Sequence, residues 1–333
     1  MKNLKQNKLA WSIGALLIGN LVITTAQADP VASAVSVVSF ENFTINWVTA
    51  NRQVDAATDF GNLSVTSSLL TAANMTGFAG ISSNPSSPTG ASLVAESVLG
   101  TVDPSIIGVP GATTSTVFNV PTLPMVGNFS ASASNEEGSP ILNFPSAPGV
   151  TPIADLHNAS YASLDSLNGS AGTSTSSQLA STMTFVAGVG GDSLEFNFDV
   201  GSYIAAFLSA GDSQSASASW SVGFTLINTT ANAIAGFFSI GDTISNNAPG
   251  SGTTLEGALN SAVAGGFVTT TPTSFTSSPI IAGNTYQLTA NISTRTQVER
   301  VPEPATLSLL GMGLLGMGML ARRAKKTSGN NYA

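Results

Sequence analysis

The sequence lacks cysteine entirely and holds very little that binds a transition metal. With no cysteine among its 333 residues, the chain can form no disulfide and can use no thiolate chemistry. His157 is its single histidine. One histidine and no cysteine fall short of the three or four protein ligands that a zinc site usually needs. We therefore expect no cofactor and no site for zinc or a redox metal.

Charge is also scarce, and positive charge above all. Charged residues make up 8% of the chain, and the basic residues between positions 29 and 300 are Arg52, Arg295 and Arg300. So few cations cannot neutralise phosphates in number, which excludes nucleic acid as a partner. The formal net charge of -8 favours solubility. Ser, Thr, Asn and Gly must supply much of the surface, as suits an adhesive or matrix protein, although other secreted proteins share this composition.

The N-terminus has the three parts of a secretory signal peptide. A basic start is followed by an apolar stretch, residues 9–23, and by the small residues Ala26 and Ala28 on either side of Gln27. This order predicts a signal peptide over residues 1–28 that is removed before Asp29. We therefore expect export across the inner membrane through the Sec translocon.

The C-terminus has an equally ordered set of features. The tetrad Val301, Pro302, Glu303 and Pro304 precedes an apolar run at 305–321. As a helix this run would measure about 25 Å, the short end of what crosses a bilayer core. The basic cluster at 322–326 would hold its far end in the cytoplasm; its cations are Arg322, Arg323, Lys325 and Lys326.

Tetrad, span and basic end together resemble the PEP-CTERM sorting tail, here at 301–326. In that family a membrane enzyme, the exosortase, recognises and removes the tail. The resemblance implies transient insertion in the inner membrane, then release to the cell surface or extracellular matrix. Members usually occur beside polysaccharide export systems, so exopolysaccharide or biofilm is an implied partner. An ordinary single-span anchor is the alternative interpretation of these residues.

The region 29–300 is expected to be a secreted, β-rich domain. Apolar and polar residues alternate at 194–200, 220–226 and 286–292, a shorter apolar run covers 234–240, and Phe43, Ile45 and Trp47 alternate likewise. Period two predicts strands with one buried face, here the even-numbered residues of the first three runs. Many short strands separated by Gly and Asn turns predict an all-β, antiparallel sandwich or jelly roll. The length leaves one large domain or two small ones open.

Three other segments carry weaker signals. Residues 93–99 and 254–264 have the composition of short helices. Residues 135–181 are rich in Ser, Gly and Pro, which favours a long loop region on the sandwich over the alternative of a linker between two domains. His157 is then expected to be an exposed loop residue. The segment 211–220 alternates small residues before Trp220, a texture that is similar to other PEP-CTERM proteins and favours a thin strand.

Motifs that carry chemistry are few. Residues 191–194 spell the Gly-Asp-Ser-Leu tetrad of one esterase group, but no histidine follows Ser193 to act as its base. The same segment partly resembles a calcium-binding repeat. Calcium takes six to eight oxygen ligands, and four acids lie near enough in sequence to be candidates, although solvated turn acids are the favoured interpretation. They are Asp192, Glu195, Asp199 and Asp212.

Three functions remain open from the sequence. The first is a non-catalytic surface or matrix protein, for which sugar-stacking aromatics would be Trp47, Trp220, Tyr161 and Tyr203. The second is a secreted carbohydrate-active enzyme with a carboxylate pair, although no pair stands out. The third is an ice-binding protein, a function after which the tail is also named. Ice binding needs a flat face of regularly spaced Thr, and the cluster at 269–271 is neither regular nor repeated.

Overall fold

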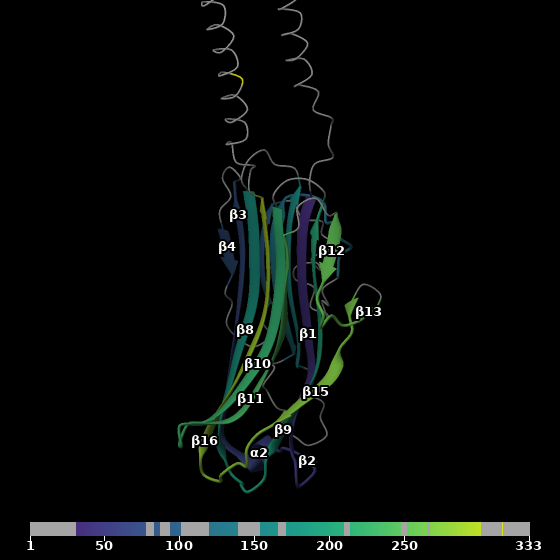
Figure 1. Ribbon diagram of the computed structural model, residues 1–333. Coiled ribbons are helices and arrows are strands. Elements are labelled where there is room, and N and C mark those ends of the chain that lie inside the picture. The colour runs from purple at the N-terminus through teal and green to yellow at the C-terminus, as the bar shows by residue number, and fades with distance from the viewer. Residues whose placement is uncertain are drawn as a thin grey trace, which may run out of the picture.

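The computed structural model consists of two antiparallel β-sheets packed face to face (Figure 1). It describes residues 31–77, 83–86, 94–100, 120–138, 154–165, 171–209, 214–247, 252–264, 267–300 and 315. The predicted all-β antiparallel sandwich is thereby confirmed. The signal peptide at 1–28, the tail at 301–326 with its span and basic end, and Asp212 lie outside the described residues, except for Leu315.

Sheet A contains, in spatial order, β12 (Thr253–Glu256), β9 (Leu194–Leu208), β1 (Val31–Trp47), β7 (Ala154–Asp165), β6 (Phe129–Gly138) and β5 (Val94–Gly100). In addition, β15 (Thr271–Thr276) pairs with β9, and β2 (Arg52–Gln53) pairs with β1. Sheet B contains β11 (Ala233–Asn246), β10 (Gln214–Asn228), β16 (Thr285–Arg300), β8 (Ala171–Ala187), β3 (Phe60–Thr76) and β4 (Ser83–Ser86). A two-stranded ribbon, β13 (Val263–Ala264) with β14 (Phe267–Val268), and a short helix, α2 (Ala56–Asp59), complete the described elements.

The alternating runs of the sequence form the strands that meet at the centre of the sandwich. Residues 194–200 lie in β9, 220–226 in β10 and 286–292 in β16, and their even-numbered side chains are buried as predicted. β1 keeps its apolar face inward in spite of an irregularity between Glu41 and Thr44, where Asn42 has a φ of 57°. This bulge shifts the inward positions from even to odd numbers, so that Phe40 and Phe43 both reach the core.

One end of the sandwich is filled with aromatic rings. Phe224 of β10 lies at their centre, with ring centroids 5.0 Å from Phe198, 5.5 Å from Phe275 and 5.6 Å from Phe40. Phe43 and Phe238 complete this group around it, at 5.9 and 6.4 Å. Aromatic rings bury large areas of apolar surface, so this end holds the most concentrated hydrophobic packing of the described core.

The other end, where β1 begins and β16 ends, is thinner and held by hydroxyl and amide groups. Ser36 Oγ of sheet A donates to the Ser219 carbonyl of sheet B at 2.7 Å, and Asn158 Nδ2 donates to the Ile292 carbonyl at 3.2 Å. Such direct bonds need small inward residues, which Ala216 and Ala218 of β10 provide. The small side chains at 215–219 therefore allow the two sheets to approach each other closely.

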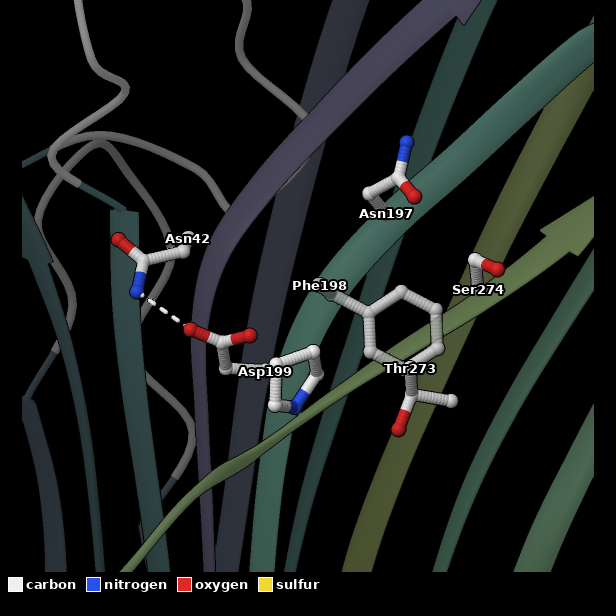
Figure 2. Close-up of a pocket in the computed structure, with 7 residues that line it drawn as sticks. Asn42, Asn197, Phe198, Asp199, Thr273 and Ser274 are labelled. Atoms are coloured by element: carbon white, nitrogen blue, oxygen red, sulfur yellow. Dashed lines mark hydrogen bonds between the residues drawn. The ribbon is translucent and has the colours of Figure 1, made fainter.

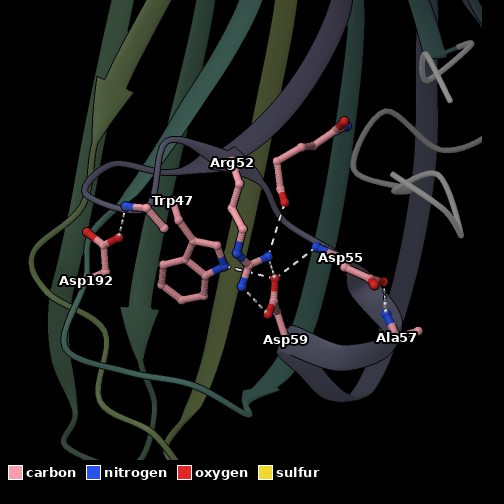
Figure 3. Close-up of polar contacts among 8 residues, drawn as sticks. Trp47, Arg52, Asp55, Ala57, Asp59 and Asp192 are labelled. Carbon is pink, nitrogen blue, oxygen red and sulfur yellow. Dashed lines mark hydrogen bonds and ion pairs between the residues drawn. The ribbon is translucent and has the colours of Figure 1, made fainter. Parts of the chain in front are cut away.

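The loop below the aromatic end is fixed by a buried carboxylate (Figure 3). Asp59, at the end of α2, accepts hydrogen bonds from Trp47 Nε1 at 2.9 Å and from the Asp55 amide at 2.9 Å. The Arg52 guanidinium binds both of its oxygens, at 2.6 and 2.7 Å. Burial alone would raise the pKa of Asp59, but these donors hold it below its ordinary value.

Several expectations for the weaker segments are wrong. Residues 94–100 form strand β5, and 254–264 hold β12, turns and β13, so neither segment is the predicted helix. The predicted loop region 135–181 contains the end of β6, the whole of β7 and the start of β8. Its inward side chains include Asn158 and Ser160, which hydrogen-bond to sheet B where aliphatic side chains would otherwise pack.

Candidate functional site

The four aromatic residues predicted to stack on sugars do not form a surface. Trp47, Trp220 and Tyr161 are 2%, 4% and 0% exposed, and they belong to the packed interior. Tyr203 is half-buried, and its hydroxyl donates to Glu256 Oε1 at 3.0 Å. Burial and this carboxylate raise the pKa of Tyr203 to about 12. Its polar end is therefore occupied by a neighbouring strand.

The calcium candidates have separate roles. Asp192 accepts hydrogen bonds from the backbone amides of Thr49 and Ala50, and these bonds lower its pKa to about 2. Asp199 accepts a bond from Asn42 Nδ2 at 2.7 Å, and Glu195 accepts one from Asn197. No group of three or more potential metal ligands occurs in the part of the chain that the structure describes. Asp192 thus clamps two turns together.

An open pocket of about 190 Å³ lies where β15 runs beside β9 (Figure 2). Its polar groups come from Asn42, Asn197, Asp199, Thr273 and Ser274. Phe198 also borders it, but the ring is 2% exposed and packs in the aromatic core. Asp199 is the one acid among the seven lining residues, whereas glycoside hydrolysis usually uses two.

His157 is buried in β7, which corrects its predicted place in an exposed loop. The ring is 2% exposed, and its Nδ1 lies 3.0 Å from Ser39 Oγ on β1. Burial lowers the pKa of His157 to about 4, so the ring is neutral at pH 7. Ser39 is 1% exposed, and a nucleophile pair needs a substrate within reach. This serine–histidine pair serves the packing of sheet A.

The Thr cluster at 269–271 is tied into the fold. Thr269 Oγ1 donates to the Ala262 carbonyl, Thr270 Oγ1 to Glu41 and Thr271 Oγ1 to the Val200 carbonyl. Their hydroxyls therefore point to three different partners. They do not form one row on one face.

The outer face of sheet B is a surface of mostly uncharged side chains. It consists of the odd-numbered residues of β10, of β16 and of β11 from Phe237 onward, and of the even-numbered residues of β8 and of β3 from Ser64 onward, because their neighbours in sequence point into the core. The strand registers align four threonines in one row across the sheet. Thr225 lies opposite Thr289, Thr289 opposite Thr182, and Thr182 opposite Thr66.

Other hydroxyls and amides continue this face on both sides of the threonine row. Adjacent positions on β16 are Gln287, Asn291 and Ser293, and the Ser293 hydroxyl lies 2.8 Å from that of Ser221 on β10. Among the described residues of this face, charge is carried by Arg295 and Glu299. The face is thus a broad array of neutral hydrogen-bonding groups.

Phe237 of β11 stands at one end of the threonine row. It pairs with Thr225 and is 65% exposed, which no other phenylalanine, tyrosine or tryptophan with a described side chain approaches. Sequence reasoning did not single out this ring. The only signal for it was the apolar run at 234–240, which does not show that Phe237 faces solvent while Phe238 faces the core.

Comparison with known proteins gives one clear match. Residues 300–326 match the PEP-CTERM protein-sorting motif. The chain carries a PEP-CTERM sorting signal. This confirms the predicted resemblance of the tail, and it implies an exported protein of the surface or extracellular space with an exosortase as processing partner. No curated protein sequence matches the chain.

The solved structures found by the same comparison show little similarity to this PEP-CTERM chain. The structure of infectious bursal disease virus, Gx strain, is 10% identical over 85% of this chain and 83% of that one, with a TM-score of 0.09. The VP2 subviral particle of infectious bursal disease virus is 9% identical over 91% and 90%, with a TM-score of 0.08.

In the described residues, no helix is both long and apolar enough to cross a membrane.

Proposed function

We propose that the protein is a non-catalytic component of the cell surface or extracellular matrix that binds exopolysaccharide after an exosortase removes its tail. The hydroxyl and amide groups on the outer face of sheet B, which bears little charge, carry this proposal. Such a face offers hydrogen bonds to a neutral, hydroxyl-rich polymer, and binding there does not have to remove many charged side chains from water. The sorting signal supports it by directing the protein to the compartment where such polymers lie.

The first prediction concerns processing. Changing Pro302 and Pro304 to Ala should leave the protein in the inner membrane, because it alters the sorting motif and leaves the following span intact. The wild-type product is expected to begin at Asp29 and to lack residue 305 onward. Intact-mass measurement of protein from the native host, with membrane fractionation, checks both. Changing Pro145 and Pro148 to Ala is the matched control, which should be processed normally. A mature form that still carries Arg322 and Arg323 would refute the proposal.

The second prediction concerns binding and turnover. The processed protein should co-sediment with the exopolysaccharide of its own host and release no reducing ends at catalytic rates. The pocket beside β15 offers a single carboxylate, and the Ser39–His157 pair is buried, so neither favours hydrolysis. Both co-sedimentation and reducing ends are measured on the same samples. Rapid appearance of reducing ends would favour a carbohydrate-active enzyme, and absence of co-sedimentation would contradict the proposed binding.

A further inference from the structure

We infer that the outer face of sheet B binds a neutral polysaccharide that lies across the strands, with one sugar ring stacked on Phe237. This inference rests on the proposed function and assigns it a place on the molecule. It also commits to one class of ligand, an uncharged glycan chain. Three features of the described face carry it: an exposed ring, a row of hydroxyls and a lack of nearby charge.

The ring faces outward because β11 keeps a continuous register with β10 from Gly236 to Asn246. The register between β10 and β11 shifts by one residue between Leu226 and Ile227, which leaves Ala235 as an extra residue on β11. Beyond the bulge Ile234 pairs with Ile227, while Phe237 pairs with Thr225. Phe237 and Ile234 are 65% and 68% exposed, so the corner of the face is apolar. The C–H face of a pyranose is also apolar, and it packs flat on an aromatic ring.

Hydrogen-bonding groups then continue in the direction that a chain would take from this ring. Neighbouring strands lie about 4.8 Å apart, so the row from Phe237 through Thr225, Thr289 and Thr182 to Thr66 is about 19 Å long. The spacing of about 4.8 Å between neighbouring strands is similar to the rise of one sugar unit in an extended glycan. Gln287 and Asn291, on either side of Thr289 along β16, add amide donors and acceptors.

Charge separates this ligand from an acidic polymer. Arg295 lies six residues beyond Thr289 on β16, about 20 Å along the strand from the threonine row. Glu299 lies further in the same direction and has the opposite sign. An anionic polysaccharide would therefore find no cation beside the Phe237 ring among the described residues of this face. A neutral chain satisfies the same hydroxyls and amides without one.

The partly capped edge of β11 argues against pairing with a second copy of the protein. The Ser278 amide donates to the Ala235 carbonyl at 2.6 Å, and Leu259 N–H donates to Asp242 Oδ2 at 3.2 Å. Two segments therefore already contact this edge strand. A dimer that paired strands along the whole of β11 would have to displace Ser278 from the Ala235 carbonyl.

The experiment compares variants of the processed protein from its host by affinity electrophoresis in gels that contain host exopolysaccharide, neutral hydroxyethyl cellulose or anionic alginate. Phe237→Ala should weaken retention by the host polymer and the neutral glucan at least about tenfold, as expected for an aromatic hot spot. Leu255→Ala is the matched control, because it removes another exposed apolar side chain, 42% exposed, from β12 of sheet A. Its retention should equal that of the wild type.

Asn291→Asp gives a second variant that keeps the size of the side chain. It places a negative charge beside the threonine row and should also weaken retention by the neutral glucan. Arg295→Gln should not change retention, and thermal unfolding checks that every variant is folded.

If the wild type is retained and Phe237→Ala is retained equally, this inference is overturned and the proposed function stands. Absence of wild-type retention would overturn both.

Two further outcomes would also overturn the inference. One is a preference for alginate that Arg295→Gln abolishes, since this would show an anionic ligand on the cation. The other is a wild-type dimer that Phe237→Ala converts to a monomer while retention stays the same, which size-exclusion chromatography measures. In that case the ring would bind a second copy of the chain.

Discussion

Phe224→Ala should lower the free energy of unfolding by about 3–5 kcal/mol, the usual cost of removing a buried aromatic side chain from a core. Phe224 is 0% exposed and contacts five other phenylalanine rings from both sheets, from Phe40 of β1 to Phe275 of β15. Its removal leaves a cavity that these rings cannot fill without changing their own packing. Urea unfolding, followed by tryptophan fluorescence, measures the change.

Thr225→Ala is the control for this prediction, because it lies next to Phe224 on β10 but on the outer face. Its side chain is partly exposed, so the expected change is within about 0.5 kcal/mol, as for most surface substitutions. Equal losses from the two variants would contradict the assignment of the buried and exposed faces of β10. Trp220→Ala should also lower the free energy of unfolding, because Trp220 lies four residues before Phe224 on the same face of β10 and is 4% exposed.

Asp59→Ala should cost about 2–4 kcal/mol, because it leaves the Trp47 and Asp55 N–H groups without their acceptor in a buried site. Arg52 is 46% exposed at its side chain and can turn to water, so its own loss is small. The same unfolding measurement applies. Glu299→Ala removes one negative charge from an exposed position of β16 and serves as the control, with an expected change within about 0.5 kcal/mol.

The cost of Asp59→Ala should also depend on pH. The pKa of Asp59 is lower in the folded protein than its ordinary value of 3.8, so the ionised carboxylate stabilises the fold above that value. As the pH falls below 3.8, the unfolded chain binds this proton first and the advantage decreases. The difference between wild type and variant should therefore be full at neutral pH and shrink in acid. A difference that grows in acid would contradict the role of the carboxylate.

The sequence predicts those strands whose inner face is apolar. In β9, β10 and β16, phenylalanine and aliphatic residues alternate with polar ones, because sheet-on-sheet packing buries every second side chain. The same alternation does not predict the strands at 129–138 and 154–165. Their inward positions hold Ser132, Asn158 and Ser160, which hydrogen-bond across the sandwich and give no hydrophobic period.

The candidate site was harder to predict for two physical reasons. A flat face depends on the register between strands that are far apart in sequence, so no local pattern shows that Thr66, Thr182 and Thr289 share a row. Phe237 faces outward through the continuous register of β11 with β10 from Gly236 to Asn246, and the extra residue Ala235 brings Ile234 to the same face. A bulge of this kind exchanges the two faces of a strand, and the apolar run at 234–240 has the same composition with or without it. The sorting motif needed neither register nor bulge, because it is recognised as a linear segment.

The position of β16 has a mechanical consequence for the proposed step in which the C-terminal tail is held in the inner membrane. β16 lies in the middle of sheet B, hydrogen-bonded to β10 on one side and β8 on the other up to Arg300, the first residue of the matched sorting motif. Tension applied through residue 301 runs along this strand and loads its two ladders in shear. Hydrogen bonds loaded in shear share the force, whereas those of an edge strand pulled sideways break one after another. In that proposed step the fold would receive a pull from the membrane through a strand that is paired on both sides.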